Sequence, residues 1–228
     1  MYLHGGVEYL VERLDLTRRE ILVAEASVPW HTRAASETTL EVVSEADGRA
    51  IGDLTVHHGI VEVGTRVTGY RRIDDRTREV LEVVELDLPE RRFTTQAVWY
   101  VFPDRVAAEV EPDRRAGAIH AAEHTAIGVL PRFAVCDRWD VGGLSTPWHP
   151  AVGAMVFFVY DGVPGGTGIA PIAFAEAERH LAATASILAG CGCRDGCPSC
   201  VQSPKCGNFN EPLDRFAALT LVEHWAGR

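Results

Sequence analysis

Five of the six cysteines lie within sixteen residues near the end of the chain, and this cluster is the clearest chemical signal in the sequence. The string CGCRDGCPSCVQSPKC places Cys197 and Cys200 in a C-x-x-C knuckle, a spacing that lets two thiolates reach one tetrahedral ion with Zn–S distances of about 2.3 Å. The gaps to Cys193 and Cys206 fit the same compact loop. We therefore predict a structural Zn²⁺ site formed by Cys193, Cys197, Cys200 and Cys206, in which Cys191 could replace Cys193.

Three other uses of the cysteines compete with zinc. A disulfide framework does not suit a chain without a secretory signal. A thioredoxin-like pair begins a helix after a strand, whereas Pro204 and Gly207 favour a loop here. An iron–sulfur cluster stays open, because it also takes four thiolates. A closed four-thiolate zinc site would hold a loop in place and catalyse nothing, and the isolated Cys136 is expected to be an inert core residue.

A second pattern, His120-Ala-Ala-Glu123-His124, matches the inverted zinc-peptidase motif. On a helix, positions i and i+4 place both imidazoles on one face, with Glu123 as a candidate base. Such a site also needs a third acidic ligand, which the sequence does not identify. A polar helix face with hydrogen-bonded histidines is the simpler interpretation.

The segment from 155 to 175 joins a buried strand to a helix through a PGGTG loop. Glycines and a helix N-terminus can cradle phosphate. However, the string fits neither known phosphate-binding pattern, and Asp161 would repel an anion. We predict a tight strand-to-helix turn.

Composition restricts the function further. The 228 residues carry a formal net charge of −10, which gives no support to a free-standing nucleic-acid binder. Lys205 is the single lysine and is followed by Cys206, so the chain has no Walker phosphate loop and we expect no ATP hydrolysis. No apolar run is long enough to cross a bilayer, and no signal peptide is recognisable. The expected location is cytoplasmic.

The predicted secondary structure changes along the chain from strands to mostly helices. Strand-length runs separated by turn signals predict strands at 7–14, 20–26, 38–43, 50–56, 65–72, 78–84 and 93–102. Turns are predicted at 15–19, 46–48 and 74–75. Later segments predict helices from about 112 to 130, 171 to 189 and 213 to 225, and a buried strand at 155–160.

The predicted fold class is α+β. It has an N-terminal β-rich half, barrel-like or sandwich-like, followed by an α/β half with a four-cysteine zinc knuckle. We place the β-rich accessory subdomain at residues 1–110 and the zinc-binding subdomain at 111–228.

Several strings together resemble one family. The strings that carry this resemblance are YDG…PGGxG, the cysteine string ending in SPKCGN, EHxAIGVLP, CDRWDVGG and the initial YLHGG. Through them the chain resembles the C-terminal zinc-binding domain of mitomycin repair factor A-like DNA helicases. The likeness covers nearly the whole chain and is densest from 120 to 212. The family's zinc ligands would fall on Cys193, Cys197, Cys200 and Cys206.

The resemblance implies an accessory domain of a superfamily two, ATP-dependent 3′-to-5′ DNA repair helicase. The domain would help to enclose single-stranded DNA beside motor domains that this chain lacks, whether these are joined in cis or act in trans. On its own it would be non-catalytic and bind single strands weakly, and the residues that contact DNA are not identified. A zinc metallopeptidase using His120, Glu123 and His124 is one alternative, and a stand-alone zinc-dependent protein-interaction module is another.

Overall fold

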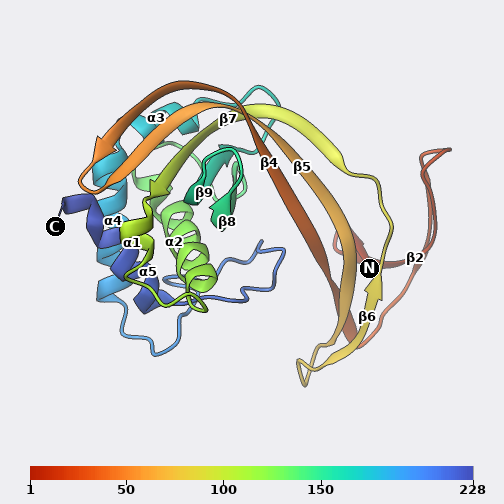
Figure 1. Ribbon diagram of the computed structural model, residues 1–228. Coiled ribbons are helices and arrows are strands. Elements are labelled where there is room, and N and C mark those ends of the chain that lie inside the picture. The colour runs from red at the N-terminus through yellow and green to blue at the C-terminus, as the bar shows by residue number, and fades with distance from the viewer. Residues whose placement is uncertain (228) are drawn as a thin grey trace. The chain divides into compact units, whose positions relative to one another are not determined.

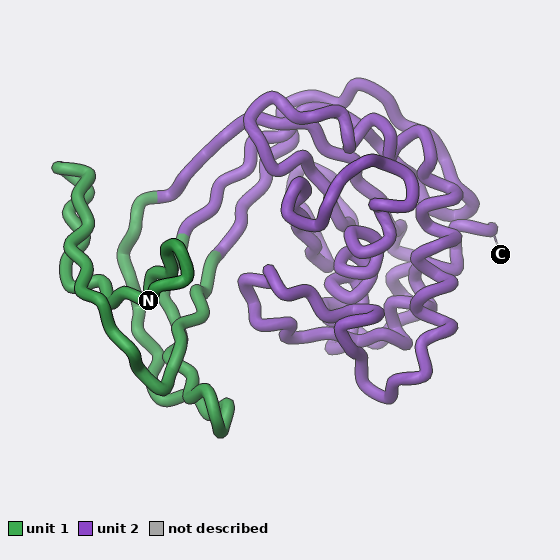
Figure 2. Tube along the Cα trace, turned by 180° about the vertical axis from the view of Figure 1, so that it is seen from behind, with its two compact units in different colours: residues 1–36, 67–89 green, residues 37–66, 90–228 purple. Residues whose placement is uncertain are grey.

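The computed structural model describes residues 1–227, which form two compact units (Figure 2). Unit 1 comprises residues 1–36 and 67–89, and unit 2 comprises residues 37–66 together with the chain from 90 onward. Two long strands run from one unit into the other. The predicted division into residues 1–110 and 111–228 has a different boundary from that of these units, and it stays a prediction.

The elements are as follows, in chain order (Figure 1). The strands are β1 (Tyr2–His4), β2 (Val7–Asp15), β3 (Glu20–Glu25), β4 (Trp30–Ile51), β5 (Leu54–Asp74), β6 (Val80–Glu85), β7 (Arg91–Phe102), β8 (Val141–His149) and β9 (Ala154–Asp161). The helices are α1 (Asp104–Ala107), α2 (Arg115–Val129), α3 (Ile169–Ala175), α4 (Ala177–Gly190) and α5 (Arg215–Val222), with the 3-10 turns η1 (Leu130–Arg132) and η2 (Glu223–Ala226).

Unit 1 consists of strands whose side chains are mostly exposed. β1, β2 and β3 form an antiparallel three-stranded sheet, and β6 pairs with the part of β5 that lies in this unit. Most positions of β2, β3 and β6 are exposed, including large apolar ones such as Ile21 and Val83. Unit 1 is therefore a thin β structure with little core of its own.

Unit 2 is built around a curved sheet with the strand order β4-β5-β7-β9-β8. Successive side chains of a strand point to opposite faces, so β7 and β9 supply two separate apolar clusters. The cluster shared with the helices includes Val98, Tyr100, Phe102, Phe157 and Val159, and the opposite cluster includes Ala97, Trp99, Val156, Phe158 and Tyr160. In Figure 1 the strands arch over the helices, with α2 close to β8 and β9.

The curvature brings the two edge strands of this sheet together. The Nε2 atom of His149, at the end of β8, donates to the carbonyl of Leu40 in β4 at 3.0 Å, and His149 is buried. The sheet is thus nearly closed and barrel-like, and this hydrogen bond gives the Leu40 carbonyl at the β4 edge a partner. The predicted fold class is confirmed: a β-rich, barrel-like part precedes an α/β part that carries the clustered cysteines. None of the helices in residues 1–227 is long and apolar enough to cross a membrane.

One predicted turn was wrong. The Asp47-Gly48 pair lies inside β4, and the chain reverses later, at Gly52, whose φ is +55°. A Cβ on Gly48 would come within 2.7 Å of the His57 ring on the neighbouring strand, so this glycine permits close strand packing. The predicted strands at 38–43 and 50–56 are consequently parts of two much longer strands.

The helices also begin and end differently from the prediction. The first long helix begins at Arg115, after a turn that contains Pro112. The predicted helix at 171–189 is two helices, because the backbone leaves helical geometry at Glu176 between α3 and α4.

His180 of α4 is completely buried in the helix-side core. Its Nε2 donates to the Ala126 carbonyl at 2.8 Å, so its Nδ1 accepts from the Tyr100 hydroxyl at 2.8 Å. Burial lowers the pKa of His180 to about 4. The imidazole is therefore a neutral core group that joins α2, α4 and β7.

We expect this histidine to make the protein less stable in acid. Between pH 6.5 and 4 the unfolded chain takes up a proton at His180 that the folded chain does not, so stability falls as the pH falls. This group alone should lower the free energy of unfolding by about 3 kcal/mol between pH 7.5 and 4. Urea unfolding at several pH values, compared with His180→Gln, measures the effect, and identical pH profiles for the two proteins would contradict it.

Candidate metal centre

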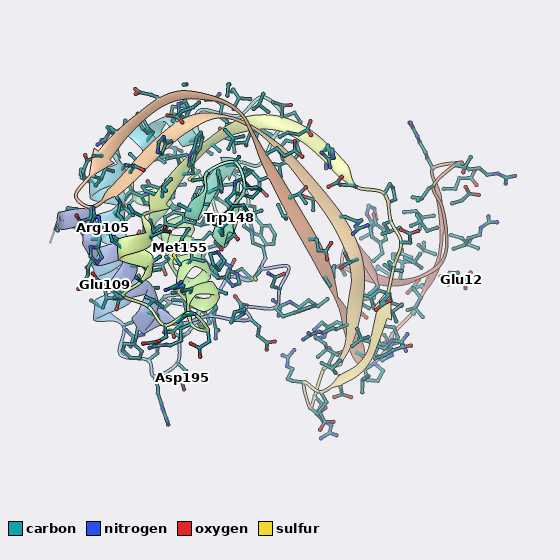
Figure 3. All side chains as sticks on the ribbon, in the orientation of Figure 1. Glu12, Arg105, Glu109, Trp148, Met155 and Asp195 are labelled. Carbon is teal, nitrogen blue, oxygen red and sulfur yellow. The ribbon has the colours of Figure 1, made fainter. Side chains whose placement is uncertain are left out.

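The cysteine loop begins where α4 ends. Cys191 donates its N–H to the carbonyl of Ile187 and has an extended backbone, so the chain leaves the helix at this residue. Cys191, Cys193 and Cys197 pack against the helix-side core, and Cys200 is buried. Asp195, labelled in Figure 3, lies in the outer part of the loop with its side chain 86% exposed. The loop therefore exposes Asp195 and keeps its sulfurs against the helices.

Four sulfur atoms form a closed group in this loop. The Sγ atoms of Cys191 and Cys193 lie 3.5 Å apart, and those of Cys197 and Cys200 lie 3.7 Å apart. Two further distances join these pairs: Cys191 to Cys197 at 3.6 Å and Cys193 to Cys200 at 3.5 Å. Four ligand atoms from one short loop thus surround a common point.

These distances fit one tetrahedral ion. Sulfur atoms 2.3 Å from a central zinc lie about 3.8 Å from each other, close to the spacing observed. A disulfide would bring two sulfurs to about 2.05 Å, and all six cysteines are free. A cluster of several irons needs more room than one ion at the centre of these sulfurs. The donor set therefore fits zinc, and the iron–sulfur alternative loses its support.

The local backbone explains how Cys197 and Cys200 converge. The carbonyl of Cys197 accepts the N–H groups of Cys200, Val201 and Gln202, and the N–H of Cys197 points to the Cys200 sulfur at 3.3 Å. Gly196 precedes this turn with φ +97°, and a Cβ there would come within 2.5 Å of the Val201 side chain. Only glycine fits this position without displacing its neighbour.

Two thiols of the group differ in their readiness to ionise. A hydrogen bond from the backbone amide of Ser199 lowers the pKa of Cys197 to about 7, whereas burial raises the pKa of Cys200 to about 12. Zinc binds thiolates, so loading the site releases protons and its affinity for zinc rises with pH.

Arg215 of α5 fastens the loop to the rest of unit 2. Its guanidinium is buried and donates to the carbonyls of Leu188, at the end of α4, and Cys193, at 3.0 Å. Four thiolates and one zinc ion carry a net charge of −2, so a buried guanidinium beside them also offsets charge. This role could not be predicted from the sequence, because a single arginine fifteen residues beyond Cys200 carries no local signal.

The structure brings together three of the four predicted ligands. Cys193, Cys197 and Cys200 lie with Cys191, whereas Cys206 lies beside His120 and His124. The sequence allows Cys191 either to pack at the helix end or to replace Cys193, whereas in the structure the sulfurs of both lie in one group. The C-x-C spacing of 191 and 193 was the available signal.

The H-x-x-E-H residues lie on α2 in the interior. His120, Glu123 and His124 are all buried, and the Glu123 carboxylate accepts the Ser145 hydroxyl at 2.5 Å. Burial raises the pKa of Glu123. The carboxylate is engaged inside the fold, so this geometry does not favour the peptidase alternative.

The PGGTG loop is a turn whose backbone amides bind a carboxylate of the same chain, that of Asp161. The buried Asp161 carboxylate, at the end of β9, accepts the backbone N–H groups of Gly168 at 2.8 Å, Ile169 at 3.2 Å and Ala170 at 2.9 Å, and also that of Thr167. These amides begin α3 and are the ones that a phosphate would need. The tight strand-to-helix turn is confirmed.

Lys205, the single lysine of the chain, donates its hydrogen bonds to backbone carbonyls inside the protein. The Nζ atom of Lys205 donates to the carbonyls of Arg138 and Val141, so it ties the cysteine loop to the start of β8. Arg194 is the opposite case, with its side chain 95% exposed. Of the two basic residues in this loop, only Arg194 extends into solvent.

Comparison with known proteins points to one family. A sequence model of the MrfA Zn-binding domain matches residues 122–201, a span that includes Cys191, Cys193, Cys197 and Cys200 and ends before Cys206. The uncharacterized protein MJ1572.1 of Methanocaldococcus jannaschii is 40% identical over 108 residues, which are 46% of this chain and 96% of that protein.

Two further comparisons, both with helicases, match nearly the whole chain. The uncharacterized ATP-dependent helicase YprA of Bacillus subtilis is 28% identical over 204 residues, covering 88% of this chain and 27% of the helicase. The crystal structure of the DUF1998 helicase MrfA bound to DNA superposes with a TM-score of 0.62 at 26% identity, covering 98% of this chain and 29% of that one. The chain thus spans between a quarter and a third of the length of these helicases.

Proposed function

Because the chain belongs to the family of proteins that carry the MrfA Zn-binding domain, with zinc as its structural cofactor, we propose that it is a non-catalytic accessory part of an ATP-dependent DNA helicase. In this proposal the motor domains hydrolyse ATP and move 3′ to 5′ during DNA repair, and this chain helps to enclose or guide the single strand. The predicted cytoplasmic location is part of the same proposal.

The observation that carries this proposal is the closed group of four sulfurs within the matched span. We assign the zinc to Cys191, Cys193, Cys197 and Cys200, which replaces the sequence-based set containing Cys206. When bound, the ion supplies no chemistry beyond holding four thiolates together. The protein's own contribution is the Cys197 turn and the Arg215 contacts, which join this loop to α4 and α5.

The partners we propose are the helicase motor domains, joined in cis or present as a separate chain. Unit 1 supports an interface, because β3 and β6 expose large apolar side chains: Leu22 is 50% exposed, Leu81 52% and Val83 66%. Apolar groups repeated along exposed strands mark surfaces that another protein covers. The matched helicases contain about two and a half times as much further chain that could do so.

The charge distribution supports weak DNA binding at most. Several arginines are already paired with carboxylates: Arg92 with Glu62 and Glu90, Arg114 with Asp214, and Arg105 with Asp53. Affinity for DNA comes largely from counterions that unpaired cations displace from phosphates, and the chain carries a net charge of −10. The motor domains would therefore hold the strand, and this chain would confine it.

We expect the isolated chain to bind a short single strand with a dissociation constant no tighter than roughly micromolar, and more weakly as salt increases. Fluorescence anisotropy with a labelled oligonucleotide at two salt concentrations measures this, and Arg194→Glu, in the outer part of the loop, serves as the charge-reversal variant. Nanomolar affinity that is insensitive to salt would contradict the proposal. Absence of binding even at low salt would favour the protein-interaction module.

A further inference from the structure

A second group of metal-binding side chains lies apart from the four cysteines. His120 and His124 are one turn apart on α2, and Cys206 approaches them from the loop that follows the knuckle. Nothing in the four-cysteine centre requires these residues. Their orientation therefore needs its own explanation.

Both imidazoles are held in the orientation of metal ligands. The Nδ1 atom of His120 lies 2.8 Å from the Pro212 carbonyl, and that of His124 lies 2.7 Å from the Val201 carbonyl. A carbonyl can only accept, so each Nδ1 carries the proton and each neutral ring has a bare Nε2. A backbone carbonyl on the far ring nitrogen is the usual support of a metal-bound histidine.

The Cys206 sulfur lies beside both imidazoles. The Nε2 atom of His120 lies 3.5 Å from the Cys206 Sγ, and the three candidate ligand atoms all lie within 4.8 Å of one another. The ring centroids of the two histidines are 4.3 Å apart. A nitrogen and a sulfur on one tetrahedral zinc ion lie about 3.6 Å apart, so the His120–Cys206 distance already has the required value.

A backbone N–H group also stabilises negative charge on the Cys206 sulfur. The backbone N–H of Asn210 points to the Cys206 Sγ at 3.3 Å, in a turn where Phe209 and Asn210 both have positive φ. The Asn210 side chain closes this turn by bonding to both the N–H and the carbonyl of Ser203. The turn is thus built to hold the cysteine against α2.

We propose that His120, His124 and Cys206 form a second site for a divalent transition metal, of which Zn²⁺ is the expected occupant. Two imidazole nitrogens and one thiolate supply three ligands, and water takes the fourth position. The ion joins the middle of α2 to the segment after the knuckle, which Val201 and Pro212 already tie to the same helix. This site does not depend on the proposed role in a helicase.

Metal content distinguishes the two centres. The zinc-loaded chain of 228 residues should contain about two zinc ions, and both Cys206→Ser and His120→Gln should contain about one. Cys136→Ser is the matched control, because this cysteine lies in neither group, and it should keep both ions. About one zinc per chain in the parent protein, unchanged in Cys206→Ser, would overturn the proposal. The contact between Cys206 and His120 would then be only a hydrogen bond between a thiol and an imidazole.

A second measurement avoids any dependence on how the variants fold. X-ray absorption at the zinc edge of the unaltered protein should show a mixed first shell, with sulfur and the multiple-scattering signal of imidazole. A shell of sulfur alone would refute the second site.

Discussion

Replacing Cys200 by Ser should remove the zinc of the four-cysteine centre and unfold the C-terminal part of unit 2. Cys200 is 7% exposed, and its sulfur contacts those of Cys193 and Cys197. Its loss leaves three thiolates converging on one point without their fourth partner. Because structural zinc supplies much of the folding energy of such loops, we expect the free energy of unfolding to fall by about 4 kcal/mol or more.

The measurement is zinc analysis together with urea unfolding followed by far-ultraviolet circular dichroism. Cys136→Ser is again the control, since it removes a thiol that belongs to neither metal-binding group, and it should cost little by comparison. If Cys200→Ser kept its zinc content and unfolded at the parent urea concentration, the four-cysteine assignment would be wrong.

Replacing Asp161 by Ala should destabilise unit 2 by about 3–5 kcal/mol. The carboxylate is completely buried and accepts the first N–H groups of α3, so its removal leaves several buried donors without an acceptor. Asp161→Asn should cost less, because one oxygen remains to accept.

Urea unfolding monitored by tryptophan fluorescence gives the comparison. Asp195→Ala is the matched control, because its side chain is exposed and the change should stay within about 0.5 kcal/mol. Equal stabilities for the Asp161→Ala and Asp195→Ala variants would show that the PGGTG loop does not depend on its internal carboxylate.

The metal-binding loop was largely predictable because its signal is local. Cys197 and Cys200 are held by a turn of a few residues, and the sequence spacing alone implies that turn. Whether Cys191 or Cys206 joins the other three cysteines depends on contacts between residues that are distant in the sequence. Cys206 lies beside His120, 86 residues away, and no spacing rule within the loop predicts that contact.

The sheet was predictable in part for the same reason. Strands rich in aromatic and β-branched residues, such as β7, were found close to their true bounds. β8 was missed because it contains Gly142, Gly143 and Pro147, which normally interrupt strands. A Cβ at Gly142 would overlap the Tyr160 ring, and one at Gly143 would overlap Glu123, so both glycines let the strand lie against its neighbours. As an edge strand with irregular register after Thr146, β8 tolerates the proline.

The most direct test of the zinc centre is X-ray absorption at the zinc edge of the Cys206→Ser variant, in which the second group has lost its sulfur. We expect a first shell of four sulfur atoms at about 2.3 Å and no imidazole signal. Nitrogen or oxygen in that first shell, or the visible absorption of an iron–sulfur cluster, would contradict the assignment to Cys191, Cys193, Cys197 and Cys200.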